Sequence, residues 1–262
     1  MPRVGRSSSV FSVSSCKNPP VSDTPLISVI VVCRNPGERL RAALASIWTQ
    51  QPEPPELVVV DGASTDGTRT WLETNRARIT TLISGPDRGV YDAMNKGITA
   101  ARGDWILFLG ADDVLAGDRV LAETAYWLRK TSAGVVAGEA AYADGRVYRL
   151  PLPARVLARN FVHHQSAFYR RSLFAENGSF DPALAIMGDY DFNLRLWRLH
   201  VVFRPLPLRV ATCGTGGLSD AGRWAGYREE IRVRHRYFPA WKCWGWDLLS
   251  VARWLRKKFV VR

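Results

Sequence analysis

The stretch LISVIVVCRNPGERLRAALASIWTQ, residues 26–50, decides the fold of this chain. Its first eight residues form a nearly continuous apolar run, which predicts a buried β-strand over Leu26–Cys33. The segment Glu38–Gln50 has the spacing of an amphipathic helix. Its apolar positions on one face are Leu40, Leu44, Ile47 and Trp48. A buried strand followed by an amphipathic helix is the building unit of an α/β fold.

The same unit recurs three more times along the chain. The predicted strands are Glu56–Val60, Ile79–Ile83 and Trp105–Leu109, and the helices after them are Thr68–Asn75, Tyr91–Ala101 and Asp118–Lys130. Four consecutive strand–helix units predict a mostly parallel sheet, which binds ligands beyond the carboxyl ends of its strands. The loops that we expect to meet there are Arg34–Gly37, Asp61–Gly67, Gly85–Gly89 and Gly110–Asp113.

Beyond Lys130 the pattern weakens into shorter elements, which we interpret as a second half of the same domain. The predicted elements are strands near Gly134–Glu139 and Gln165–Tyr169, a hairpin across residues 143–145, and helices at Tyr190–Leu199, Gly222–Tyr237 and Trp241–Lys258. We therefore divide the chain into a flexible Ser-rich leader (1–25), a catalytic domain (26–220) and basic amphipathic C-terminal helices (221–262).

Composition limits the class of protein. The 262 residues carry a formal net charge of +12, and residues 223–262 contain eleven Lys and Arg against three Asp and Glu. The four cysteines form no C-x-x-C pair and no Cys/His cluster, which argues against structural zinc and a disulfide framework and favours the cytoplasm. No apolar run reaches the roughly 18 residues that a membrane-spanning helix requires.

Two adjacent carboxylates follow the fourth predicted strand, WILFLG. Asp112 and Asp113 are oxygen ligands at the mouth of the sheet, where Mg²⁺ or Mn²⁺ could share its coordination shell with a diphosphate. We therefore expect a divalent metal at these residues. The alternative is that the pair caps the next helix, since Asp is a good N-cap.

Two further loops carry candidate ligands for a nucleotide sugar. Asp61 ends the second strand in the turn DGASTDGT, whose small residues leave room for a base and ribose. Asp87 and Arg88 lie in the Gly-rich loop after the third strand. A carboxylate in such a loop can accept hydrogen bonds from a bound nucleotide.

The segment MGDYDFNLRL holds a third acidic centre. At the start of the predicted helix, the carboxylate of Asp189 could take a proton from an attacking hydroxyl, although an isolated GDYD would usually be an N-cap. We expect Asp191, His164 and Gln165 to line the acceptor side. The adjacent His163 and His164 should point to opposite faces if this segment is a strand, so that at most one faces the cleft.

As an ordered series, five motifs resemble the inverting family-two glycosyltransferases of GT-A fold, especially bacterial enzymes of exopolysaccharide and lipopolysaccharide assembly. The motifs are ISVIVVCRN, ELVVVDGASTDGT, GPDRGVYDAMNKGI, ARGDWILFLGADD and MGDYDFNLRL. The resemblance covers about residues 26–220. It implies a Rossmann-like nucleotide-binding half and an acceptor-binding half, and a nucleoside-diphosphate sugar as donor.

By that resemblance, Asp61 would contact the nucleotide, Asp112 would bind the metal, and Asp189 would be the general base of an inverting transfer. Ser219, in the loop GTGGLSD, would lie near the phosphates.

The sequence departs from the family pattern in four places. The usual first acid of the metal motif is Gly110 here, and the usual Glu before the base is Gly188. The usual aromatic-Asn pair after the first strand is Arg34-Asn35, and the second Asp of the nucleotide loop is Gly62.

The C-terminal segment 241–262 combines apolar and basic residues at helical spacing. Its apolar positions recur every three or four residues: Trp241, Trp244, Leu248, Val251, Leu255 and Phe259. Such a helix can lie on an anionic membrane, and a polyisoprenyl-diphosphate-linked acceptor would explain that location on the inner face of the cell membrane. The alternative is a terminal helix packed on the core.

Three other functions remain open from the sequence alone. A pI near 10 with interleaved Arg and Trp is compatible with nucleic-acid binding, but no recognised binding motif supports it and we expect no nucleic-acid partner. The glycines at 110 and 188 make a non-catalytic glycan-binding or scaffold protein conceivable. A nicotinamide-dependent oxidoreductase lacks support, because no G-x-G-x-x-G follows the first strand.

Overall fold

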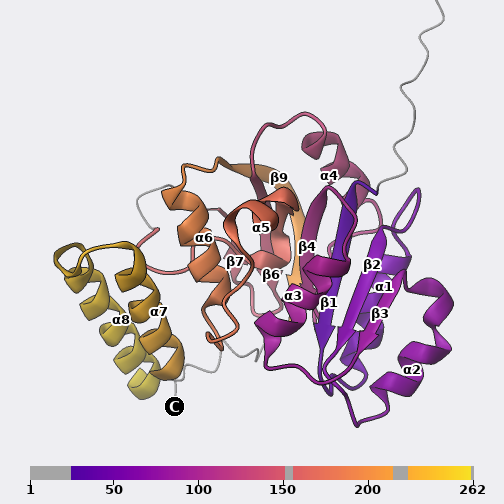
Figure 1. Cartoon of the computed structure of the whole chain (residues 1–262), viewed down its shortest axis with the longest axis horizontal. Helices are drawn as coiled ribbons and strands as arrows, with labels where there is room; N and C mark the ends of the chain where they lie inside the picture. The colour runs from indigo at the N-terminus through magenta and orange to yellow at the C-terminus, as the bar shows by residue number, and fades with distance from the viewer. Residues whose placement is uncertain (1–24, 151–155, 215–223, 261–262) are drawn as a thin grey trace, which may run out of the picture.

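The computed structural model describes residues 25–150, 156–214 and 224–260. Within them, nine strands form one central sheet in the order β3-β2-β1-β4-β8-β6-β9-β5, with β7 paired to β6 (Figure 1). All but the last residue of the predicted leader, and Ser219, lie outside the described residues.

The first half of the sheet is parallel, as predicted. Its strands are β1 (Ile27–Cys33), β2 (Glu56–Asp61), β3 (Thr81–Ser84) and β4 (Trp105–Gly110). The helices between and after them are α1 (Arg39–Trp48), α2 (Thr68–Thr74), α3 (Val90–Ala100) and α4 (Val120–Leu128), with a 3-10 turn η1 (Arg76–Arg78) before β3. The four predicted strand–helix units are confirmed.

The second half is mixed. Its strands are β5 (Val114–Leu115), β6 (Val135–Tyr142), β7 (Val147–Tyr148), β8 (Ala167–Arg170) and β9 (Phe203–Cys213). Strand β8 runs antiparallel to both β4 and β6, whereas β9 runs parallel to β6. The predicted hairpin is confirmed, because Ala141 of β6 pairs with Val147 of β7 across the turn.

The sequence analysis does not predict β9, the longest strand. Pro205 and Pro207 interrupt its apolar pattern, and proline cannot donate a hydrogen bond to a neighbouring strand. The strand tolerates them because β5 pairs only with Ala211 and Thr212, so most of that edge carries no ladder in the described residues. The pairing with β6 is also irregular near its middle.

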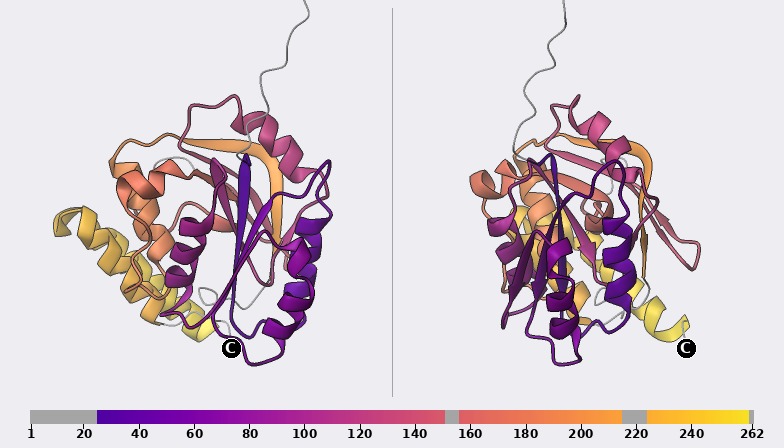
Figure 2. Two further views of the ribbon diagram at one scale, coloured as in Figure 1. Left: turned by 45° about the vertical axis from the view of Figure 1, so that its right-hand side comes forward. Right: turned by 90° about the vertical axis from the view of Figure 1, so that its right-hand side faces the viewer.

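Helices cover both faces of the sheet, and alternate residues of the central strands serve two separate cores (Figure 2). Helices α1, α2 and α4 pack on one face, and α3, α5 (Ser172–Asn177) and α6 (Gly188–Arg198) pack on the other. Helices α7 (Trp224–Tyr237) and α8 (Ala240–Val260) form a hairpin that contacts α6 through α7, and α8 is the outermost element in Figure 1.

A buried glutamate joins the amino-terminal ends of the parallel strands. Glu56 of β2 accepts hydrogen bonds from the Ser28 hydroxyl, the Arg102 guanidinium at 2.8 Å, and the backbone N–H groups of Arg102 and Gly103. Burial alone would raise the pKa of Glu56, but hydrogen bonds from Arg102 and Ser28 hold it below its ordinary value of 4.5. Glu56 thus links β1, β2 and the turn before β4.

We predict that Glu56→Gln lowers the free energy of unfolding by about 1.5–3 kcal/mol at pH 7, because hydrogen bonds to a charged group are lost. The folded-state pKa is depressed, so this contribution is present above the ordinary value of 4.5 and is lost as the pH falls through the lower folded-state pKa. Urea unfolding followed by tryptophan fluorescence, at pH 7 and at successively lower pH below 4.5, measures both effects. The exposed Glu73→Gln on α2 is the control and should change little.

Candidate active site

Two of the predicted loops meet at the carboxyl ends of β1 and β2. The Asn35 N–H donates to the Ser64 hydroxyl at 2.8 Å, and the Thr65 N–H donates to the Asn35 side-chain oxygen at 2.7 Å. The Gly37 N–H donates to the Asp66 carboxylate at 2.9 Å. These cross-loop bonds bring together the loops predicted to form the donor side of a site.

Asp61 lies beneath this loop cluster and is fully buried. Its carboxylate accepts the Ser64 N–H at 3.1 Å and the Ser84 hydroxyl at 2.8 Å, and its backbone oxygen accepts the Gly85 N–H. In this conformation Asp61 therefore shapes the loops from below. The expected contact with a nucleotide stays a prediction, since no atom of Asp61 is exposed.

Asp87 belongs to the cluster, whereas Arg88 points along α3. A β-carbon at Gly62 would lie 2.2 Å from the Asp87 Oδ2 atom, so the carboxylate occupies the space that a side chain at residue 62 would take. Arg88 is exposed and its guanidinium pairs with Asp92 at 2.8 Å. Of the two, Asp87 is the better placed for a ligand in the loop cluster.

The two carboxylates after β4 have different environments. Asp113 is 2% exposed, and its oxygens accept the N–H groups of Gly110 and Gly214, each at 2.9 Å. Burial raises the pKa of Asp113, and the nearby Asp112 adds to the rise. Asp112 keeps 31% of its side chain exposed and lies 3.8 Å from the Arg39 guanidinium.

These environments distinguish the two residues that we expected to bind a metal. Asp113 ties the end of β4 to the end of β9, because each of its oxygens accepts a hydrogen bond from a backbone amide, and its metal role stays a prediction. Asp112 fits a hard cation, since it offers carboxylate oxygens at an accessible position, and one carboxylate suffices when a diphosphate supplies other ligands. Within the described ranges, no three His, Cys, Asp or Glu side chains are grouped so as to hold a metal by themselves.

Asp189, the predicted base, lies at the start of α6 and is 8% exposed. Its Oδ1 atom accepts the Tyr91 hydroxyl at 3.1 Å and the Tyr190 N–H at 2.8 Å. Its Oδ2 atom accepts the Asn160 amide at 2.8 Å and pairs with His164 Nδ1 at 2.9 Å. Burial alone would raise the pKa of Asp189, but hydrogen bonds and charge from His164, with those from Tyr91 and Tyr190, hold it below its usual range.

The two adjacent histidines do not point to opposite faces, so that expectation is wrong. His164 begins the 3-10 turn η3 (His164–Ser166), and strand alternation does not apply there. Both rings line the same pocket and stack, with centroids 6.1 Å apart. The His163 Nε2 atom is 2.7 Å from the Tyr142 hydroxyl, and burial lowers the pKa of His163 to about 4.

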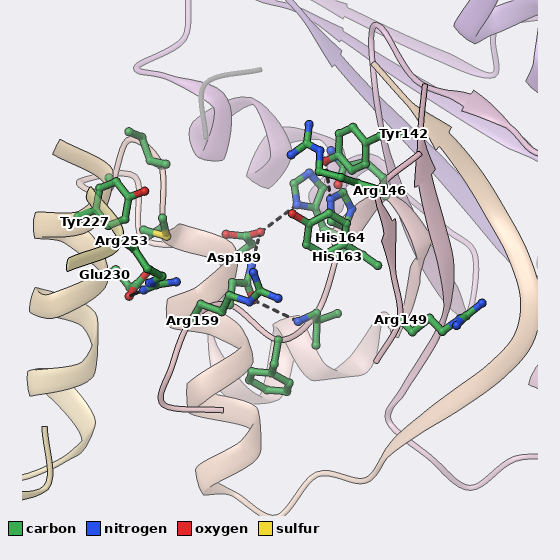
Figure 3. Close-up of a pocket in the computed structure, with 18 of the residues that line it drawn as sticks. Tyr142, Arg146, Arg149, Arg159, His163, His164, Asp189, Tyr227, Glu230 and Arg253 are labelled. Carbon is green, nitrogen blue, oxygen red and sulfur yellow. Dashed lines mark hydrogen bonds and ion pairs between the residues drawn. The ribbon is translucent and has the colours of Figure 1, made fainter. Parts of the chain in front are cut away.

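Asp189 and the histidines open onto a pocket of about 680 Å³ between the sheet and the helices α6, α7 and α8 (Figure 3). Gln165 also lines it, and its buried Oε1 atom has no hydrogen-bond partner in the described structure. Among the described lining residues, five cations outnumber two carboxylates. The cations are Arg146, Arg149, Arg159, Arg253 and Lys257, and the carboxylates are Asp189 and Glu230. Arg146, Arg149 and Arg253 are held in ion pairs with Asp144, Glu139 and Glu230, so the net positive charge around the pocket is smaller than the lining residues alone indicate.

Asp191, which we expected on the acceptor side, does not reach this pocket. It is 3% exposed and pairs with Arg236 of α7 at 3.0 Å and with Arg195 at 3.4 Å. Residues two apart on a helix lie about 200° apart, so Asp191 faces away from Asp189. Its role is to attach α7 to α6.

At Gly110 and Gly188, two of the departures from the family pattern, another side chain of the site lies close to the glycine. A β-carbon at Gly110 would lie 2.4 Å from the Asp113 carboxylate. A β-carbon at Gly188 would lie 2.7 to 2.9 Å from ring carbons of Tyr91, whose hydroxyl donates to Asp189. In both places a side chain of the site occupies the space that the usual acid would need.

Sequence reasoning missed four residues of the site. Asn160 and Tyr91 hold Asp189, and Arg159 and Arg253 line the pocket. Tyr91 lies in the motif GPDRGVYDAMNKG, and this motif is the one sequence feature that could have identified it as a site residue. The others come from segments without a motif, because their role depends on contacts between distant parts of the chain.

Comparison with known proteins identifies the family of this chain. Residues 28–193 match the family described as Glycosyl transferase family 2. A PGL/p-HBAD biosynthesis glycosyltransferase of Mycobacterium tuberculosis is 34% identical over 207 residues, which cover 75% of this chain and 80% of that protein. The succinoglycan biosynthesis protein ExoO of Rhizobium meliloti is 32% identical over 198 residues, covering 66% and 56%.

Solved structures show the same fold. S. aureus TarS superposes with a TM-score of 0.66 at 20% identity, covering 89% of this chain and 72% of that one. A mannosyltransferase from Pyrobaculum calidifontis, in complex with GDP-Man and Mn²⁺, gives 0.60 at 21% identity, covering 88% and 74%. With the family match over most of the catalytic region, these results show that the chain belongs to glycosyl transferase family 2 and is a glycosyltransferase of GT-A fold.

Proposed function

We propose that this glycosyltransferase moves a sugar from a nucleoside-diphosphate donor to a hydroxyl of a glycan or a polyisoprenyl-diphosphate-linked acceptor, with inversion, during assembly of a bacterial surface polysaccharide. The observation that carries the proposal is the ionised carboxylate of Asp189 at the wall of the pocket. Structural neighbours solved with UDP-GlcNAc and with GDP-Man support a nucleotide sugar as donor.

The donor side would be formed by the loops after β1 to β4. Asp87 and the backbone of the cross-bonded loops would hold the nucleotide, and Ser219 stays a candidate near the phosphates. Asp112 would hold Mg²⁺ or Mn²⁺, which, when bound, neutralises the charge that develops on the departing diphosphate. Mn²⁺ in one structural neighbour supports this assignment.

The acceptor side would be the pocket at Asp189. General-base catalysis centred on this carboxylate removes the proton of the acceptor hydroxyl as the oxygen attacks the anomeric carbon. Attack from the side opposite the leaving diphosphate inverts that centre. The cations in the lining, although several are held in ion pairs, support an acceptor that carries phosphate, and Gln165 would accept a hydrogen bond from an acceptor hydroxyl.

The orientation of α8 supports attachment to an anionic membrane surface. Its apolar stripe faces outward, with Trp241 70%, Trp244 66%, Leu248 61% and Phe259 71% exposed. Its inner face is polar, because Asp247 and Ser250 bind the buried Arg234 of α7. The alternative of a terminal helix packed on the body of the protein also fits the contacts of α8 with α7, so membrane attachment rests on the outward stripe alone. No helix in the described residues is long and apolar enough to span a bilayer.

Nucleotide-sugar binding can be measured by a thermal-shift panel of UDP-, GDP- and dTDP-sugars with and without Mn²⁺. A donor at one hundred times its Kd stabilises the folded state by about 2.7 kcal/mol, which is roughly 5–10 °C for a protein of this size. We expect one nucleotide class to give such a shift, and Asp112→Asn to lose its Mn²⁺-dependent part. Asp104→Asn, at the other end of β4, is the matched control and should behave as wild type. No shift with any donor would contradict the proposal.

Membrane attachment is tested by co-sedimentation with vesicles of phosphatidylglycerol or phosphatidylcholine. Wild type should bind the anionic vesicles, and Trp241→Glu/Trp244→Glu should bind them at least about tenfold more weakly, since tenfold corresponds to only 1.4 kcal/mol of lost burial. Trp127→Glu removes an exposed tryptophan from α4 and should leave binding unchanged. Equal binding of the double variant and wild type would exclude α8 as the membrane contact.

A substitution at Gly188 tests whether the contact between this residue and the Tyr91 ring is needed for activity. Gly188→Ala forces the Tyr91 ring to shift, so we expect about 1–3 kcal/mol of lost stability and a marked loss of transferase activity. Gly245→Ala, also within a helix but with open space around the added carbon, should lose neither. Full activity in Gly188→Ala would show that Tyr91 is not needed at Asp189.

A further inference from the structure

The carboxylate of Asp189 has no free acceptor position in this structure. A carboxylate offers about four lone-pair sites on its two oxygens. Tyr91 and the Tyr190 N–H occupy those of Oδ1, and Asn160 and His164 occupy those of Oδ2. An acceptor hydroxyl could reach the carboxylate only by displacing one of these donors.

His164, in contrast, presents a free ring nitrogen to the pocket. Both oxygens of Asp189 already accept hydrogen bonds, from Tyr91 and the Tyr190 N–H and from the Asn160 amide, so we assign the proton shared with His164 to the Nδ1 atom of the ring. The Nε2 atom then has a lone pair, and no described residue donates to it. The side chain is 23% exposed and lines the pocket beside Asp189 (Figure 3).

The neighbouring histidine cannot take this role. The Nε2 atom of His163 is already bonded to the Tyr142 hydroxyl, and its Nδ1 atom is buried without a partner in the described structure. Of the two rings, only that of His164 combines an orienting carboxylate on one nitrogen with an open second nitrogen. This is the arrangement in which an imidazole acts as a general base.

The fold places His164 between the two sides of the site. The turn η3, which His164 begins, packs against β4, β6 and β9. The end of β4 leads directly to Asp112, the proposed donor-side carboxylate, and the end of β9 is tied there by Asp113. A base at this position can serve a hydroxyl that enters from the pocket and attacks a sugar held at the loops.

We propose that His164, oriented by Asp189, is the group that takes the proton in the transfer reaction. The acceptor O–H gives its proton to His164 Nε2 while the oxygen forms the new bond to the anomeric carbon. The bond from that carbon to the donor phosphate breaks, and the nucleoside diphosphate leaves with its electron pair. Asp189 stabilises the imidazolium until it returns the proton to solvent. This inference rests on the proposed function and assigns its general base to the pair of His164 and Asp189.

The first experiment measures nucleotide release, with water as acceptor, from whichever UDP-, GDP- or dTDP-sugar wild type cleaves fastest. His164→Gln keeps an amide that can donate to Asp189 but has no basic nitrogen, so kcat should fall about 10²- to 10⁴-fold while KM for the donor changes little. Free imidazole should restore at least a tenth of the lost kcat in His164→Ala. The exposed His200→Asn is the matched control and should keep wild-type kcat.

The outcomes separate the inference from the proposed function. A His164→Gln enzyme with kcat within threefold of wild type, or a His164→Ala enzyme that imidazole does not rescue, would overturn the role of His164 and leave a positioning role. No release from any donor by wild type would instead overturn the proposed function.

A second measurement requires no substrate. Nitrogen-15 NMR of the histidine rings should show the Nδ1–H tautomer at His164 in wild type at pH 8 and its loss in Asp189→Asn. The Nε2–H tautomer at His164 in wild type would overturn the proposal.

Discussion

A carboxylate in the protein interior must be surrounded by hydrogen-bond donors, and the acceptor half of this molecule is organised around that requirement at Asp189. The groups that donate hydrogen bonds to Asp189 come from α3, from the segment before η3 and from α6. Because Tyr91 belongs to the parallel half and His164 to the mixed half, one charged group connects the two. Asp189 therefore joins the two halves at the pocket, in addition to the sheet that they share.

The parallel half of the fold could be predicted from sequence because its signals are local. Uninterrupted apolar strands and helical spacing gave β1 to β4 with errors of one or two residues at their ends. Strand β9 could not be predicted, since its prolines contradict the local pattern and only an open edge makes them tolerable. Its pairing with β6 is a property of the assembled sheet.

The candidate site residues also differ in how far local sequence predicts them. Motifs singled out Asp112 and Asp189, because each follows a strand or begins a helix whose position is set by nearby residues. They could not separate Asp112 from Asp113 or Asp189 from Asp191, since the distinction depends on which backbone amides or arginines approach each carboxylate. Likewise, the amphipathic pattern of α8 was visible, but its outward direction follows from the polar contacts of Arg234 with the opposite face.

The contact between Gly188 and the Tyr91 ring affects how substitutions at the two positions combine. The ring fills the space above residue 188, and its hydroxyl donates to Asp189, so a side chain at residue 188 and the Tyr91 ring compete for the same volume. An acidic residue at position 188 requires the ring to move or to be replaced by a smaller side chain. Although the two positions are almost one hundred residues apart in sequence, the effects of substituting them should be coupled and not additive.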